Sequence, residues 1–244
     1  MDNQIVKRVI KNTINKDYAI ERETFRCLEI NIPTTGEWMA EIKAKAEKIE
    51  SKLNAGQANS SEKRDKQTIK IDNLSGLIAE YACDMILRGY LGSAKVEKPS
   101  SKTSKNQIDI VLADGKKTIE VRSSCVKNGI EFALFAKPKG KENGQYFDVI
   151  GPYSNGYKPG EIEKDYYMRV LYCCEKKAFL ELLDTPTLRL YITGGATKDM
   201  MNDHSVYQIK HLIPAGGEVE IESDYRVVPL GKSLDFDDFI STIK

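Results

Sequence analysis

Two acidic residues and an arginine are spaced so that a single turn would bring them together. Asp109 is followed, after ten residues, by Glu120, and Arg122 comes two residues later. Asp114-Gly115, between the two acids, is a typical two-residue turn of a β-hairpin. If the chain reverses there, Asp109 lies directly opposite Glu120 on the neighbouring strand. Because side chains alternate along a strand, we expect Asp109, Glu120 and Arg122 on one face of the hairpin.

The opposite face of this hairpin is apolar and is predicted to be its core side. Its side chains are those of Ile108, Ile110, Leu112, Ile119 and Val121. Burial therefore fixes the register, because a shift of one residue would turn all of these side chains towards water.

Paired carboxylates on adjacent strands need a compensating cation, since like charges directly opposite each other destabilise a sheet. Arg122 could supply that charge, or a divalent cation could. Mg²⁺ binds through one or two carboxylates together with water and substrate phosphate. An ion held in this way can activate water and stabilise an in-line displacement at phosphorus. The alternative is a solvated charged face, on which Arg122 bridges to Glu120 along the strand.

This arrangement resembles the core motif of the PD-(D/E)xK nuclease superfamily, and a stand-alone chain of this size most resembles a type II restriction endonuclease. Asp109 and Glu120 match the two acids of the D…(D/E)xK pattern. The sequence departs from that pattern at two positions, where Ile108 stands in place of proline and Arg122 in place of lysine. Arginine stays protonated and cannot accept a proton, but it can hold a phosphate and offset transition-state charge. Water activation would then depend more heavily on the metal.

A predicted helix before the hairpin resembles the helix that contributes a further acid in this family. It contains Glu80, whose alternative role is that of a surface carboxylate, and the resemblance covers about residues 73–125. The resemblance implies Asp109 and Glu120 as Mg²⁺ ligands, with Mn²⁺ as a substitute ion. It implies Glu80 as an outer metal or water ligand and Arg122 as the phosphate partner, so that all four are expected catalytic residues.

The activity implied is Mg²⁺-dependent endonuclease cleavage of double-stranded DNA at a short specific sequence. Such enzymes typically act as homodimers, because the twofold symmetry of the protein mirrors that of the DNA site. Two alternatives stay open. One is a DNA-binding protein that kept the fold and lost catalysis, and the other is a nuclease for repair or junction resolution.

Basic residues accumulate around this segment, although the whole chain carries a formal net charge of only +1. Between Lys95 and Lys141 there are eleven basic and five acidic residues. A local excess of this kind neutralises phosphates. The predicted DNA contacts are Lys102, Lys105, Lys127, Lys137 and Lys139.

The elements ahead of the hairpin follow from hydrophobic periodicity. Residues 1–32 are predicted to be a mixed helical leader. Thr34 and Glu37 form a capping-box pattern at the start of an amphipathic helix. The polar stretch 56–67 is predicted to be a flexible loop, which completes a helical N-terminal portion over residues 1–68.

Asn73 is placed to cap a second helix, from Leu74 to about Arg88, which Gly89 and Gly92 would end. A short helix is also expected at about 175–183 and another after Gly194-Gly195, with Thr197 as its N-cap. Strands are predicted at 107–113, 117–124, 146–151, 166–173, 188–193, 206–213 and 218–229.

These elements predict an α/β (α+β) class with a restriction-endonuclease-like mixed central sheet flanked by helices. We expect one domain over residues 1–244, with a nuclease-like core at 69–195 and a C-terminal helix and strands at 196–244. The sequence predicts neither a membrane span nor secretion. Its five cysteines, without a CxxC pair, favour reduced thiols and a cytoplasmic location.

Overall fold

The computed structural model describes most of the chain in seven stretches. They are residues 4–13, 22–51, 65–99, 108–135, 147–154, 161–211 and 224–244. Every structural statement below concerns these residues.

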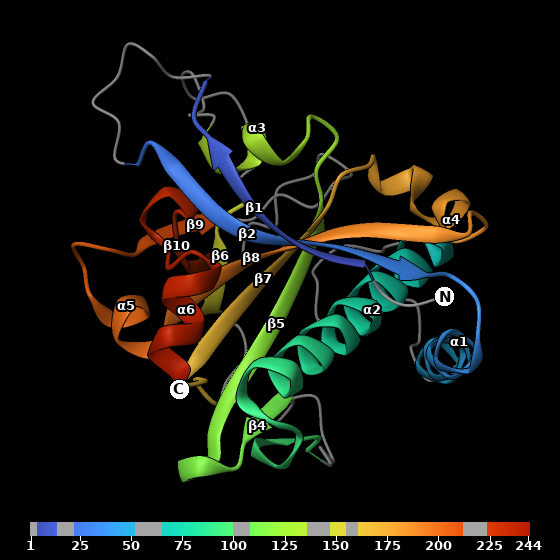
Figure 1. The fold of residues 1–244 in the computed structure, drawn as a ribbon, viewed down its shortest axis with the longest axis horizontal. Coiled ribbons are helices and arrows are strands. Elements are labelled where there is room, and N and C mark those ends of the chain that lie inside the picture. The colour runs from blue at the N-terminus through green and yellow to red at the C-terminus, as the bar shows by residue number, and fades with distance from the viewer. Residues whose placement is uncertain are drawn as a thin grey trace.

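A mixed sheet of seven strands, in the order β1-β2-β8-β7-β5-β4-β3, forms the centre of the fold (Figure 1). Only β5 and β7 pair in parallel, and the other neighbours are antiparallel. Its strands are β1 (Gln4–Lys11), β2 (Thr24–Pro33), β3 (Val96–Glu97), β4 (Ile110–Leu112), β5 (Lys117–Cys125), β7 (Tyr166–Tyr172) and β8 (Thr187–Thr197).

In the seven described stretches, a smaller sheet and six helices complete the architecture. The second sheet has the order β6-β10-β9, with β6 (Val149–Tyr153), β9 (Gln208–His211) and β10 (Asp224–Val228). The helices are α1 (Glu37–Glu50), α2 (Lys66–Leu91), α3 (Ile130–Phe135), α4 (Phe179–Leu182), α5 (Lys198–Asn202) and α6 (Phe236–Ile243). Short 3-10 turns lie at Ser93–Lys95, Asp114–Lys116, Lys176–Ala178 and Leu230–Lys232. The predicted class, a mixed central sheet flanked by helices, is therefore confirmed.

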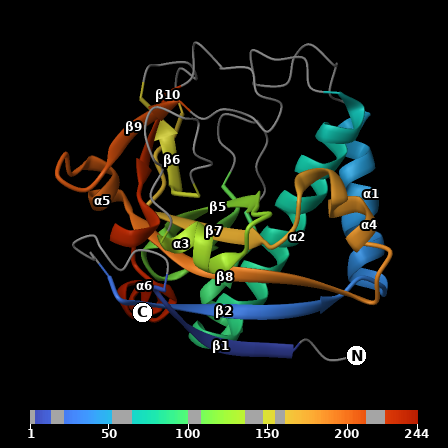
Figure 2. The ribbon, with the colours of Figure 1, turned by 90° about the horizontal axis from the view of Figure 1, so that it is seen from above.

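The core lies on both faces of the large sheet. On one face, α2 runs along β5 and buries Leu77, Ile78 and Ala82 against the strands. On the other face, α3 and the second sheet cover Tyr167 and Leu171 of β7. Figure 2 shows α1 and α2 on one side of the molecule and β6, β9 and β10 on the other. Residues on β5 and β7 can therefore point into either of two separate layers.

The predicted helical leader over residues 1–32 is wrong. Residues 4–11 and 24–33 form the antiparallel strands β1 and β2. The physical reason lies in a period of two that helical periodicity does not explain: Leu28, Ile30 and Ile32 alternate along β2 and are all fully buried.

The first helix was predicted correctly, but its capping box was not. Gly36 precedes α1 without a side-chain cap. The Thr34 hydroxyl instead donates to the carbonyl of Thr185, which ties the end of β2 to the segment before β8.

The second helix begins earlier than predicted, at Lys66. Asp65 caps it by accepting the amide of Thr68 at 2.6 Å, so Asn73 lies inside the helix. Most of the predicted flexible loop at 56–67 lies outside the described residues, and its last two residues are helical. The helix passes through Gly89 and ends at Gly92, whose φ of 97° suits glycine.

The centre and end of the chain follow the predicted strand order with shifted bounds. Gly194-Gly195 does not end a strand, because β8 continues through it to Thr197. Thr197 does cap α5, accepting the amide of Met200 at 3.2 Å. The C-terminal α6 was not predicted. Within the stretches that the structure describes, no helix combines the length and the apolar character needed to cross a membrane.

Candidate functional site

The hairpin at the edge of the large sheet has the predicted register. Ile110 faces Ile119 and Leu112 faces Lys117, so the next position outward places Asp109 beside Glu120. The turn itself is a 3-10 turn over Asp114–Lys116, with positive φ angles at Gly115 and Lys116. The reversal that the sequence predicted is therefore present with a different turn geometry.

The apolar side of this hairpin is its core side, as predicted, and it packs against α2. Ile110, Leu112, Ile119 and Val121 all belong to the core cluster that contains the buried side of α2. Glu120 and Arg122 consequently point to the opposite face of the sheet, because neighbouring residues on a strand alternate.

Asp109 lies one residue before β4, where the ladder between β4 and β5 stops. Its Oδ2 accepts the amide of Val121 at 2.7 Å, which places the carboxylate at the end of the ladder. Burial raises the pKa of Asp109 to about 6, and the charge of Glu120 also raises it. The Val121 amide, Arg122 and Lys164 act in the opposite direction. Asp109 is thus a largely desolvated acid at the open end of the hairpin.

Glu80 brings a second acid to Asp109 from α2. Burial raises the pKa of Glu80 to about 7, and repulsion from Asp109 is the next largest cause. Lys45 of α1 lies 3.8 Å from its carboxylate and offsets part of this effect. The predicted helix acid is therefore close enough to Asp109 for the two charges to interact strongly.

Glu120 forms an ion pair with Arg122 along β5. The Arg122 side chain is 39% exposed and that of Glu120 is 14% exposed. The attraction of Glu120 raises the pKa of Arg122 above its usual range. The alternative interpretation, a charged face on which Arg122 bridges to Glu120, predicted this contact.

The acidic side chains near Asp109 can be compared with the ligands that Mg²⁺ requires. In the ranges described above, no group of three or more His, Cys, Asp or Glu side chains is placed to hold a metal ion. The structure instead brings Asp109 into electrostatic contact with Glu80 and with Glu120. Mg²⁺ accepts sites with one or two carboxylates and fills its other positions with water and phosphate. Asp109 together with Glu80 or Glu120 offers carboxylate oxygens of the kind that Mg²⁺ binds.

Of the predicted DNA-contacting lysines, only Lys127 is described. It is exposed in the turn that follows β5. Lys102 and Lys105, like Lys137 and Lys139, lie outside the described residues.

Two cations near the site were not found from the sequence. Lys164 is only 2% exposed, donates from Nζ to the carbonyl of Ile162 at 2.6 Å and lowers the pKa of Asp109. Arg169 of β7 is 1% exposed and lies in register with Arg122. No local spacing signals either residue, because they reach the hairpin through the parallel pairing of β5 with β7.

The protonation of Glu80 predicts how stability depends on pH. Unfolded carboxyl groups ionise near pH 4, whereas Glu80 and Asp109 in the folded protein hold their protons to about pH 7 and 6. The folded state binds more protons in this interval, so the free energy of unfolding falls as pH rises from about 4 to 7. Glu80→Gln is expected to be more stable than the wild type at pH 8 by about 1–3 kcal/mol.

Urea denaturation at pH 5 and pH 8 measures this difference. Glu41→Gln, which removes an exposed carboxylate from α1, is the matched control and should change stability little at either pH. A Glu80→Gln variant that is less stable than the wild type at pH 8 would contradict the assignment of Glu80 as a strained buried acid.

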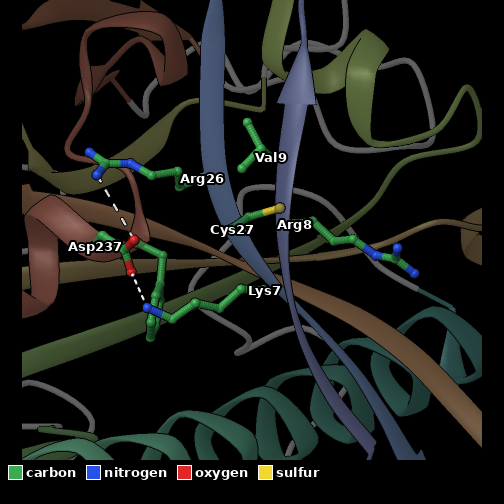
Figure 3. A pocket seen from close by; sticks show the side chains of 7 residues that line it. Lys7, Arg8, Val9, Arg26, Cys27 and Asp237 are labelled. Atoms are coloured by element: carbon green, nitrogen blue, oxygen red, sulfur yellow. Dashed lines mark hydrogen bonds and ion pairs between the residues drawn. The ribbon is translucent and has the colours of Figure 1, made fainter.

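A small pocket lies at the other edge of the large sheet, between β1, β2 and the start of α6 (Figure 3). It is lined by Lys7, Arg8, Val9, Arg26, Cys27, Phe236 and Asp237. Asp237 lies 2.9 Å from Lys7 and 3.9 Å from Arg26, so these cations are already ion-paired. We assign no catalytic role to this pocket.

Comparison with known proteins found no matching family model, no matching curated protein and no matching solved structure.

Proposed function

We propose that this protein is a Mg²⁺-dependent endonuclease that hydrolyses phosphodiester bonds of double-stranded DNA. One observation carries the proposal: Asp109, at the open end of the β4–β5 hairpin, interacts with Glu80 from the helix and Glu120 from the strand. Arg122 lies beside Glu120 on the same strand. These are the residues that the resemblance to the PD-(D/E)xK superfamily selected.

The proposed roles are those that the resemblance implies for each side chain. Asp109 would hold the ion together with Glu120, with Glu80 as an outer ligand of metal or water. When bound, Mg²⁺ would supply an activated water and offset charge on the phosphate. Arg122 cannot accept a proton, but its half-exposed guanidinium retains donors that can bind and orient a phosphate.

The finer form of this proposal is a type II restriction endonuclease that acts as a homodimer at a short palindrome. It rests on the resemblance and on symmetry, since a twofold protein can contact both halves of a twofold DNA site.

One observation favours the alternative of a DNA-binding protein without catalysis. The ion pair between Arg122 and Glu120 gives this acid a permanent cation, so that Glu120 does not require a metal. Binding of DNA without cleavage in any divalent ion would support this alternative.

A cleavage assay separates these functions. Purified protein is incubated with plasmid and mixed genomic DNA in Mg²⁺, in Mn²⁺ or in EDTA. We expect discrete fragments with either ion and none in EDTA. Preference for nicked or branched DNA over linear duplex would point to a repair or junction nuclease. Absence of cleavage from every DNA and ion combination contradicts the nuclease proposal.

Metal binding is expected to stabilise the protein at pH 8, because a cation would offset the repulsion between Glu80 and Asp109. Mg²⁺ at about 100 times its Kd should raise the free energy of unfolding by about 2.7 kcal/mol, and EDTA should reverse the gain. Thermal melts with increasing Mg²⁺ measure it. Asp109→Asn should lose most of this response, and Asp114→Asn, in the exposed turn of the same hairpin, should keep it. An equal response in both variants would place the metal elsewhere.

A further inference from the structure

Two arginines lie side by side on the face of the large sheet that is opposite α2. Arg122 of β5 and Arg169 of β7 are register partners across the parallel pair. Their neighbours Val121, Met168 and Val170 face the α2 side of the sheet, so both guanidinium groups lie on the opposite side. Arg169 is 1% exposed, whereas the Arg122 side chain is 39% exposed. The pair therefore extends from solvent into the protein.

Both arginines retain buried donors without a partner among the described residues. Arg169 donates from Nη2 to the hydroxyl of Ser124 at 2.8 Å and from Nε to the carbonyl of Phe147 at 3.4 Å, but its Nη1 has no partner. Nε of Arg122 is also buried and has none. Unsatisfied buried N–H groups cost free energy and are rare in native proteins. Two adjacent arginines with open donors can together bind one acceptor group.

The charges around this pair indicate that the acceptor is an anion. Glu120 is engaged by Arg122, and Asp148 lies 2.6 Å from Nζ of Lys210. Asp109 also attracts Arg122. Among the described residues, Arg169 forms no ion pair with a carboxylate, and Asp148 is the acid whose charge acts on it. Burial lowers the pKa of Arg169 to about 10, whereas Asp148, which also pairs with Lys210, acts in the opposite direction, and the charge of Arg122 lowers it further.

Two tyrosines of the second sheet lie near Arg122. Tyr153 of β6 and Tyr225 of β10 stack with their ring centroids 4.2 Å apart, and their hydroxyls are 2.5 Å apart. Both rings lie within electrostatic range of Arg122. Arg122 is thus flanked by Glu120 and by two tyrosine rings of the second sheet.

We propose that Arg122 and Arg169 together bind one phosphoryl group, with Arg169 as a phosphate-binding residue that the motif does not predict. A phosphate offers several acceptor oxygens and negative charge, which matches two guanidinium groups with open donors. Free phosphate and a phosphodiester of DNA share this chemistry. That the phosphate belongs to DNA rests on the proposed function, whereas the anion site itself does not.

Binding of inorganic phosphate tests the site directly. Melting temperature and calorimetric titration are measured with increasing phosphate at constant ionic strength. At about 100 times the Kd, phosphate should raise the melting temperature of the wild type by about 5–10 °C. Arg169→Gln should lose at least about tenfold in phosphate affinity, without a lower melting temperature in phosphate-free buffer, since a poorly compensated buried charge has been removed. Arg189→Gln, on the exposed surface of β8, is the matched control and should respond like the wild type.

Arg122→Gln, at the exposed end of the pair, should show a similar loss and carries the test if Arg169→Gln does not fold. A wild type whose stability does not depend on phosphate overturns the proposal. So does an Arg169→Gln variant that binds phosphate as tightly as the wild type.

A second experiment identifies the source of the phosphate. It is carried out in EDTA, so that no DNA is cleaved. A short duplex with 5′-hydroxyl ends should compete with phosphate for the wild type if the site holds an internal phosphodiester. Competition only by 5′-phosphorylated duplex assigns a terminal phosphate, and competition by neither assigns free phosphate. Asp109→Asn should bind phosphate normally, so loss of the nuclease function and loss of the anion site give different results.

Discussion

Asp109→Asn is expected to lower the rate of DNA cleavage on the order of a thousandfold while leaving the protein folded. Loss of one preorganised electrostatic group at a reacting centre typically costs a factor of about 10²–10³, and Asp109 is the acid that both other carboxylates approach. The substitution is nearly isosteric. The amide oxygen of asparagine can still accept the Val121 amide that Asp109 binds at 2.7 Å.

The same variant has an independent signature in its stability. Because burial and repulsion raise the pKa of Asp109 to about 6, ionisation of this acid opposes folding above that pH. Asp109→Asn should therefore be no less stable than the wild type at pH 8. A loss of activity that came from unfolding would instead appear as a lower urea midpoint.

Asp114→Asn provides the matched control for activity. Asp114 belongs to the same hairpin and carries the same charge, but its side chain is 75% exposed and pairs with Lys95. It should cleave DNA within about twofold of the wild type, because an exposed ion pair contributes little. Comparable activity in Asp109→Asn and the wild type would remove Asp109 from the mechanism and with it the nuclease proposal.

Gly194→Ala and Gly195→Ala are expected to give the largest losses of stability, each about 3 kcal/mol or more. Gly194 has a φ of 100°, and a Cβ there would lie 2.3 Å from the carbonyl oxygen of Leu234. At Gly195 a Cβ would lie 2.0 Å from the carbonyl oxygen of Tyr167. Both obstacles are backbone atoms, which cannot move aside as a flexible side chain can.

These glycines matter because they let two segments approach closely. Gly195 exchanges backbone hydrogen bonds of 3.0 and 2.9 Å with Leu234, immediately before α6. A methyl group at either position would push this segment away and loosen the packing of α6 on β8.

Gly76→Ala is the control for this prediction. Gly76 lies in α2, and a Cβ there meets no atom within 4 Å, so alanine should raise helix stability by up to about 1 kcal/mol. Urea denaturation of the three variants gives the comparison. Losses below about 1 kcal/mol at both Gly194 and Gly195 would show that the backbone there relaxes easily.

The reversal of the hairpin and the apolar side of its strands follow from local sequence alone, whereas the position of Asp109 does not, because this residue lies before β4 and acts on Glu80 and Cys83 of α2. The period of two over residues 108–112 and 117–121, with Asp114-Gly115 between them, is local information. A reversal at that turn leaves only one register that buries Ile110 and Ile119. The apolar stripe of α2 is equally evident in the sequence. The cap at Asp65 is not, because the pattern favours Asn73 as the start of the helix.

The surroundings of the hairpin depend on contacts between segments that are far apart in the sequence. The strands β1 and β2 were mistaken for a helix, because alternation in a short segment competes with helical spacing until a partner strand is known. Arg169 reaches the site through the pairing of β5 with β7, and Lys164 lies just before β7, across a long intervening stretch of chain. The raised pKa values of Glu80 and Asp109 depend first on burial, and then on the charge of Asp109 for Glu80 and on that of Glu120 for Asp109. Local spacing fixes which face of a strand a residue occupies, but desolvation and the identity of its neighbours arise only when distant segments pack together.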